Sequence, residues 1–333
     1  MIVRELPEVC DLHIHVGASV APHIMWSIAH QQGLKLPVKD YWEFVDLITV
    51  NPQKVKSLQD YISILHQWNE KIQSSPAAIE RAVYEIIGKE FRSSNVTQIE
   101  LRFNPMKRNI RGEKDLDHTI HAAIRGLDRA CLAYGLKAGL IFCLAREWTP
   151  DINEIILDKA IKYSRRGVVG IDVAGPESET IELRDEVMSY QKMFEKAKAA
   201  GLGTTIHTGE TLDTSTTGMK AVLEHLKPDR IGHGIRAAYS QEVMDMLVAS
   251  NTVLEICPTS NLNTKAIQSL DEMKYILGQF WEQGVPFTIN TDGTYFIRTN
   301  LQREFSLLRE GGILTAEQLD SVRRFAFEAS FLS

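Results

Sequence analysis

The sequence predicts an α/β fold, a (β/α)8 TIM barrel with a helical insertion after the first strand. Eight short apolar runs alternate with stretches of helical periodicity along nearly the whole chain. The alternative, a doubly wound open sheet, is less favoured because no G-x-G-x-x-G motif follows the first run. The predicted strands are Val9–Ile14, Val96–Phe103, Lys137–Cys143, Val168–Val173, Gly203–Ile206, Arg230–Ile231, Thr252–Ile256 and Pro286–Ile289.

Helices are predicted between these strands from the spacing of their apolar residues. Gly135, Gly201 and Gly284 stand just past predicted helices and before the next strand, where glycine commonly ends a helix. The clearest helical stretches are Leu183–Ala200, Gly218–Leu226, Gln241–Ala249 and Asp271–Gln283.

One connection is far longer than the others and covers about residues 19–95. An insertion after the first strand emerges at the face where barrel active sites form. It therefore either roofs a pocket or forms a helical addition with its own aromatic core. Its predicted helices are Pro22–Gln32, Tyr41–Ile48, Leu58–Ile72 and Pro76–Ser93. Because no repeat or linker divides the chain, we expect residues 1–333 to form a single domain.

Composition narrows the possible partners. The net charge of −6 argues against nucleic acid or an anionic membrane as a partner. No apolar run approaches the roughly 18 residues of a membrane span. The four cysteines show no C-x-x-C spacing, which is typical of reduced thiols in a cytoplasmic protein. Nothing in the sequence predicts an oligomeric state.

Potential metal ligands collect at the predicted carboxyl ends of the strands, where the catalytic groups of barrels lie. The first strand ends in two histidines spaced i, i+2, which places both imidazoles on one face. Further polar residues follow the fifth, sixth and eighth strands. The whole set is His13, His15, His207, Glu210, His233 and Asp292.

Three imidazoles and one carboxylate, from His13, His15, His207 and Asp292, suit one Zn²⁺ per chain. Such an ion lowers the pKa of a bound water to about 7. The segment 170–177 after the fourth strand contains no lysine to bridge two metals, so a single ion is expected.

Two residues of the set are left free of the metal. Glu210 lies three residues beyond a predicted ligand and can act as a general acid or base. His233 can orient the water and stabilise developing charge.

With these motifs the chain resembles the adenosine deaminase family, which are mononuclear zinc enzymes on a (β/α)8 barrel. The resemblance covers almost the whole chain, in the same order. The matching segments are His13–His15, Glu100–Pro105, Asp172–Gly175, His207–Glu210, Gly232–Gly234, Glu255–Asn261, Asn290–Asp292 and Glu328–Leu332.

The resemblance implies an aminohydrolase acting on C–N bonds of cyclic amidines. A small-molecule 6-aminopurine nucleoside would be converted to the 6-oxo product plus ammonia. Glu210 would protonate ring N1, and His233 and Asp292 would position the water that adds to C6. His15 would also border the substrate, and the backbone of Gly175 would meet purine N3.

Two substrate-contacting positions depart from the family pattern. The family usually has Asp at the position of Gly17, contacting the ribose 5′-hydroxyl, and at the position of Gly293, contacting purine N7. A hydrogen bond to a charged group is worth about 1.5–3 kcal/mol, so losing both weakens binding of plain adenosine. Gly17 is also expected to leave space for a 5′-substituent, as in 6-aminodeoxyfutalosine or 5′-methylthioadenosine. Arg298 and Arg146 are candidate partners for an anionic group there.

Two other interpretations stay open. In the first, water or other side chains replace these contacts and adenosine remains the substrate. In the second, the chain is a non-catalytic purine-binding protein that retains the zinc site.

Overall fold

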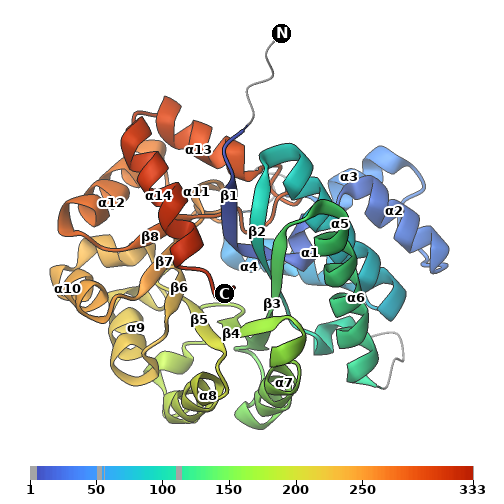
Figure 1. The fold of residues 1–333 in the computed structure, drawn as a ribbon, viewed down its shortest axis with the longest axis horizontal. Coiled ribbons are helices and arrows are strands. Elements are labelled where there is room, and N and C mark those ends of the chain that lie inside the picture. Colours follow the sequence, from blue (N-terminus) through green and yellow to red (C-terminus); the bar gives the residue numbers. More distant parts are fainter. Residues whose placement is uncertain (1–5, 51–54, 56, 110–114, 333) are drawn as a thin grey trace.

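The computed structural model describes residues 6–50, 55, 57–109 and 115–332. Eight parallel strands form one sheet in the order of the sequence (Figure 1). They are β1 (Val9–His15), β2 (Val96–Phe103), β3 (Lys137–Ala145), β4 (Val168–Ala174), β5 (Gly203–Thr208), β6 (Arg230–His233), β7 (Val253–Ile256) and β8 (Phe287–Ile289).

The ring closes between the first strand and the segment just after β8. The backbone N–H of His15 donates to the carbonyl of Asp292 at 2.7 Å, and the N–H of Asp292 donates to the carbonyl of His13 at 2.7 Å. Ile14 and Asp292 form a parallel bridge. The predicted (β/α)8 barrel is therefore confirmed, and its closure holds Asp292 beside the two histidines of β1.

Helices surround the ring in Figure 1. Gly135 and Gly284 end α6 and α12 in the left-handed conformation, with φ of 67° and 71°, as their sequence positions predict. The outer helices are α6 (Leu116–Tyr134), α7 (Pro150–Lys162), α8 (Val187–Ala199), α9 (Ser215–Ala221), α10 (Gln241–Ser250), α11 (Pro258–Asn263), α12 (Leu270–Gln283), α13 (Leu301–Glu310) and α14 (Ala316–Glu328). No helix of the described residues is long and apolar enough to cross a membrane.

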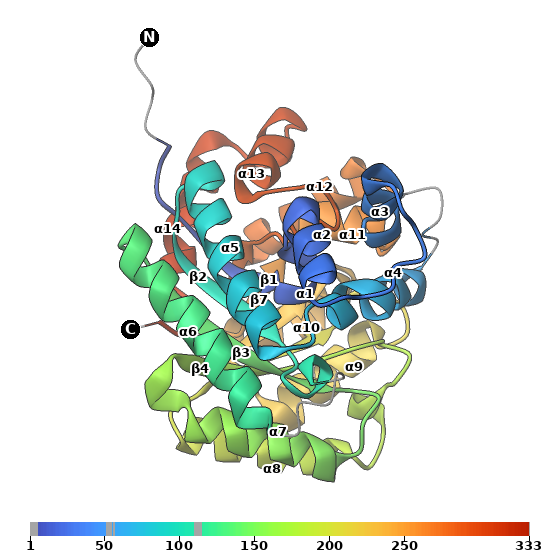
Figure 2. The same cartoon turned by 90° about the vertical axis from the view of Figure 1, so that its right-hand side faces the viewer.

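The long connection between β1 and β2 is helical, as predicted, and begins earlier than expected. Its first helix, α1, follows β1 directly, and the predicted helix 58–72 changes to π-helical geometry after Ile64. Figure 2 shows these helices gathered on one side of the barrel. The segments are α1 (Val16–Ser19), α2 (Pro22–Gln31), α3 (Tyr41–Ile48), α4 (Leu58–Ile64), the π-helical Leu65–Glu70 and α5 (Pro76–Ser94).

The two roles weighed for this insertion are both present. Trp26 of α2 and Phe44 of α3 form an aromatic contact with ring centroids 5.0 Å apart. Residues of α4 and of the π-helical segment line the main pocket. The insertion thus has its own aromatic cluster and also forms a wall of the pocket.

The last residues of the chain close the end of the barrel at which the strands begin. The carboxyl terminus lies at the centre of the ring in Figure 1. The hydroxyl of Ser330 and the N–H of Phe331 both donate to Glu100 Oε1 at 2.6 Å. The Phe331 ring lies under the guanidinium of Arg230 at 3.6 Å, and a Cβ on Gly203 would collide with this ring. Because Gly203 and Arg230 begin their strands, this contact seals the amino-terminal end and leaves the carboxyl end for a site.

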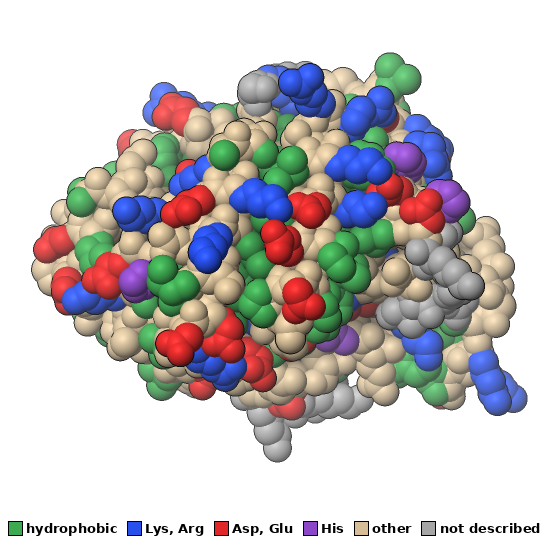
Figure 3. All heavy atoms as spheres, turned by 90° about the horizontal axis from the view of Figure 1, so that it is seen from below, with side chains coloured by type: hydrophobic (Ala, Val, Ile, Leu, Met, Phe, Trp, Pro, Cys, Tyr) green, Lys and Arg blue, Asp and Glu red, His purple; other side chains and the backbone are tan. Residues whose placement is uncertain are grey.

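Acidic and basic side chains are interspersed on the face drawn in Figure 3. Such a mixed surface has no single-sign field across it.

Candidate metal centre and substrate pocket

Three histidines from two strands converge at the carboxyl end of the barrel. Ligand nitrogens of His13, His15 and His207 lie within 4.8 Å of one another. Nε2 of His15 and Nε2 of His207 are 3.2 Å apart. Oδ1 of Asp292 is 3.8 Å from Nε2 of His13 and 3.5 Å from Nε2 of His15. The four predicted ligands therefore face one point.

Buried carboxylates orient two of these imidazoles. Nδ1 of His13 is 2.7 Å from Glu255 Oε2, and Nδ1 of His207 is 3.1 Å from Asp172 Oδ1. Nε2 of His13 is buried and has no hydrogen-bond partner among the described residues. Burial lowers the pKa of His13 well below its usual value, so its imidazole is neutral. A neutral histidine such as His13, held by a carboxylate through Nδ1 and with Nε2 unpartnered, is typical of a metal-binding site, and the residues fit Zn²⁺.

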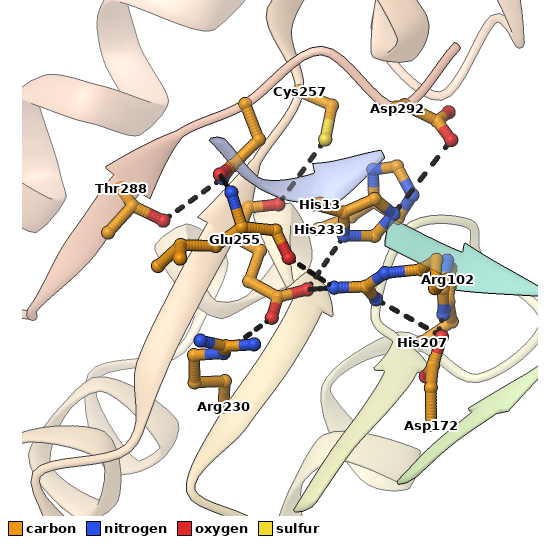
Figure 4. Close-up of polar contacts among 12 residues, drawn as sticks. His13, Arg102, Asp172, His207, Arg230, His233, Glu255, Cys257, Thr288 and Asp292 are labelled. Carbon is orange, nitrogen blue, oxygen red and sulfur yellow. Dashed lines mark hydrogen bonds and ion pairs between the residues drawn. The ribbon is translucent and has the colours of Figure 1, made fainter. Parts of the chain in front are cut away.

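The two carboxylates belong to a buried charge network that crosses the barrel interior (Figure 4). Arg102 lies between Asp172, at 3.1 Å, and Glu255, at 2.8 Å. Arg230 Nε is 2.7 Å from the other oxygen of Glu255, and its guanidinium also pairs with Glu100. All five side chains are at most 1% exposed. Although burial opposes it, His207 and Arg102 hold the pKa of Asp172 below its usual value.

His233 and Asp292 adopt a backbone conformation that non-glycine residues rarely take, each with φ of 61°. This geometry costs on the order of 1–3 kcal/mol per residue and persists where surrounding contacts fix it. His233 Nδ1 lies 3.0 Å from the side-chain nitrogen of Asn261, and Ser260 Oγ donates to Asp292 Oδ2. Burial lowers the pKa of His233 to about 3, so this imidazole is neutral as well.

Glu210 stands beside the histidine cluster on the loop that follows β5. Its Oε2 is 3.6 Å from His233 Nε2, and its Oε1 accepts a hydrogen bond from Thr264 at 2.9 Å. Burial, and then the charges of Glu177 and Asp292, raise the pKa of Glu210 well above its usual value. A carboxyl group of this kind keeps its proton near neutral pH and can donate it.

Glu177 was not among the site residues predicted from the sequence, where segment 170–177 was considered only for a lysine that could bridge two metals. Its Oε1 accepts from the backbone N–H of Glu210 at 3.0 Å, and its Oε2 accepts from the N–H of Thr211 at 2.6 Å. It therefore fixes the loop that carries Glu210.

A pocket of about 840 Å³ opens above the histidines. Gly17 and Gly175 line it, as predicted, whereas Gly293 is not among its lining residues. Gly175 has φ of 122°, and a Cβ there would lie 2.7 Å from Glu147 Oε2. Gly293 packs against Ala18, whose Cβ would be 2.5 Å from a Cβ at position 293.

Gly17 lines the pocket, and side chains from other segments come close to it. A Cβ on Gly17 would lie 3.1 Å from Arg108 Nη2, 3.4 Å from Leu65 Cδ1 and 3.6 Å from Glu70 Cγ. Arg108 is 1% exposed and pairs with Glu70 at 3.0 Å. Residues distant in sequence therefore occupy the region that glycine leaves.

The arginines considered for an anionic group lie elsewhere. Arg146 is buried in an ion pair with Glu182 at 2.6 Å, and Arg298 is exposed. The pocket wall instead contains Arg108 and Lys107, which follow β2. No periodicity or motif marks these two residues in the sequence.

A sequence model of the family described as adenosine deaminase matches residues 8–333. The adenosine deaminase of Haemophilus ducreyi is 33% identical over 333 residues, covering 98% of this chain and 92% of that enzyme.

Three solved structures share the fold. The adenine deaminase of Arthrobacter aurescens superposes with a TM-score of 0.86 at 20% identity, covering 98% of this chain and 94% of that one. The N6-mAMP deaminase of Arabidopsis has a TM-score of 0.81 at 24% identity, with 98% and 94% covered. A zinc-bound amidohydrolase of Burkholderia ambifaria has a TM-score of 0.82 at 19% identity, with 98% and 86% covered.

Proposed function

We propose that this chain, which belongs to the adenosine deaminase family, hydrolyses the 6-amino group of a purine nucleoside. The chain is an aminohydrolase acting on C–N bonds. The observation that carries the proposal is the meeting in one pocket of three imidazoles, two of them oriented by carboxylates, with Asp292 and with Glu210, whose pKa is raised.

His13, His15, His207 and Asp292 would hold one Zn²⁺, which when bound supplies a water of lowered pKa as the nucleophile. The unpartnered Nε2 of His13 supports this assignment, because a buried imidazole nitrogen without a partner is costly unless a ligand occupies it. The zinc in the related amidohydrolase supports the choice of metal.

Residues of the chain donate the proton and orient the water. Protonated Glu210 donates to N1 of the ring, which makes C6 more electrophilic. His233 and Asp292 orient the water for addition to C6, and ammonia then leaves as the 6-oxo purine forms. Neutral His233, 3.6 Å from Glu210, is close enough to take part in moving the proton.

The finer proposal is that the nucleoside is adenosine or a 5′-substituted adenosine. The corner at Gly17 holds the pair Arg108–Glu70, at 3.0 Å, and the pair Lys107–Glu147, at 2.6 Å, lies beside Gly175. Glu70 can accept from a 5′-hydroxyl, whereas the two cations can bind a 5′-anion. The substrates in the names of these proteins, adenosine, adenine and N6-mAMP, share the purine ring and differ in the sugar and phosphate that it carries; N6-mAMP also has a methyl group on its 6-amino nitrogen.

A substrate panel with the zinc-loaded protein tests the proposal. Adenosine, 2′-deoxyadenosine, adenine, AMP, 5′-methylthioadenosine and 6-aminodeoxyfutalosine are followed by loss of the adenine absorbance band and by ammonia release. Preference for adenosine assigns the 5′ contact to Glu70, and preference for AMP assigns it to Arg108 and Lys107. If no compound reacts while zinc is stoichiometric, the deaminase proposal fails. Binding without turnover then supports a purine-binding protein.

A further inference from the structure

Tyr61 of α4 lines the pocket and has a buried hydroxyl without a hydrogen-bond partner in the described part of the chain. The side chain is 5% exposed and lines the pocket, and its ring packs edge-on against Phe296 with centroids 4.7 Å apart. By distance and angle its hydroxyl has no hydrogen-bond partner among the described residues, although the Ser260 side chain lies close to it. A buried hydroxyl without a partner is costly, so this group is expected to meet one when a ligand enters.

The hydroxyl lies across the ring of strands from the proton donor. It is 3.3 Å from the point where a Cβ on Gly293 would lie, next to the closure of β1 and β8. Glu210 follows β5, which is four strands from β1 in the ring of eight. A planar ligand over the histidines therefore has one edge toward Glu210 and the opposite edge toward Tyr61.

The positions of the nitrogen atoms in the purine ring determine which atom faces Glu210 and which faces Tyr61. N1 and N7 lie on opposite sides of C6, and both accept hydrogen bonds. When C6 sits over the histidine cluster with N1 at Glu210, N7 points toward the β1–β8 side. Gly293 has no side chain to offer there, and Ala18 fills the space where one would begin.

We propose that Tyr61 is a specificity-determining residue whose hydroxyl donates a hydrogen bond to N7 of the bound purine. This inference rests on the proposed function for the orientation of the ring. Burial, with the charges of Asp292 and Glu210, raises the pKa of Tyr61 well above its usual value, so the hydroxyl stays a donor. Purines then bind better than analogues with a C–H group in place of N7.

Equilibrium binding of inosine and 7-deazainosine tests this without requiring turnover. The zinc-loaded wild-type protein is expected to bind inosine about tenfold more tightly, because 7-deazainosine leaves the Tyr61 hydroxyl unpaired. In Tyr61→Phe, which keeps the ring and its packing on Phe296, the two affinities are expected to become equal. Tyr163→Phe is the matched control, since Tyr163 is also 5% exposed and lies outside the pocket, and it should keep the wild-type ratio.

A purely structural role has a different signature. The hydroxyl of Ser260 lies near Tyr61 and donates to Asp292, so Tyr61 could instead support a metal ligand. In that case Tyr61→Phe lowers zinc content and weakens both ligands equally. An unchanged preference for inosine in Tyr61→Phe, with zinc and folding intact, overturns the proposal.

Failure of this inference and failure of the proposed function are separable. A wild-type protein that deaminates adenosine but binds both inosines equally refutes only the role of Tyr61. A protein that distinguishes the two inosines but deaminates nothing refutes only the catalytic proposal.

Discussion

Replacing Glu255 by glutamine tests whether the buried charge network orients the metal site. Glu255 Oε2 accepts from His13 Nδ1 at 2.7 Å and from Arg102 at 2.8 Å, and Glu255 Oε1 forms an ion pair with Arg230 Nε at 2.7 Å. The amide of Glu255→Gln has one oxygen and one NH₂ group, so the NH₂ must face one of these donors. The carboxylate that raises the basicity of His13 is lost at the same time.

The expected loss is mainly in zinc affinity. Each arginine retains one carboxylate, Asp172 for Arg102 and Glu100 for Arg230. The destabilisation should therefore stay below the roughly 3–5 kcal/mol of a stranded buried charge. Loss of a carboxylate behind a metal-binding histidine weakens binding by about 10- to 100-fold, which is about 1.4–2.7 kcal/mol.

Competition with a chromogenic chelator measures zinc affinity, and thermal unfolding of the metal-free protein measures stability. Glu100→Gln is the matched control, because Glu100 belongs to the same network but contacts Arg230, Ser330 and Phe331 rather than a histidine. It should lower stability and leave zinc affinity unchanged. Wild-type zinc affinity in Glu255→Gln, or an equal loss in Glu100→Gln, would refute the reasoning.

Three further predictions follow from the site and the fold. Glu210→Gln should lower kcat at least about 100-fold with zinc content unchanged, because it removes the proton donor to N1; full activity would contradict the assignment. Burial raises the pKa of Glu304 from 4.5 to about 7, which destabilises the native state by about 3 kcal/mol above pH 7. The native state holds this proton after the unfolded chain has lost it, so stability should fall between about pH 4.5 and 7. Glu304→Gln should remove this part of the slope in urea unfolding series at each pH; an unchanged slope would contradict the shift. Removing the metal with a chelator should abolish activity and lower the Tm, and added zinc should restore both; full activity of the stripped protein would exclude a catalytic metal.

The barrel was predictable because its signal is local and repeated. Each strand and helix leaves its own periodicity, and eight β/α alternations specify a parallel closed ring. The meeting of His13, His15, His207 and Asp292 was predictable for the same reason. The carboxyl ends of all strands of such a barrel lie at one face, so residues at those ends come close together. The insertion helices were also predicted, except for the four-residue α1, which is too short to show a period.

The pocket corner at Gly17 was not predictable from those signals. The sequence did not indicate that Arg108 and Leu65 lie beside Gly17. Arg108 comes from the loop after β2, and Tyr61 comes from an insertion helix. The direction of loops and inserted helices depends on tertiary packing, so no periodicity places these side chains.

The buried charge network next to the metal site could not be predicted from the alternation of charged and apolar residues in a strand. Glu100 and Arg102 alternate with apolar Leu101 in β2, so the two charged residues lie on one face of the strand. Alternation in an ordinary sheet puts the charged face in water, but closure of this ring turns it inward, where Glu100 and Arg102 are fully buried. Buried charges of this kind persist only when paired, and Arg102 finds its partners on β4 and β7 only after the ring has closed. The orientation of His13 and His207 therefore depends on barrel closure, so a substitution that loosens the closure should weaken zinc binding without touching a ligand.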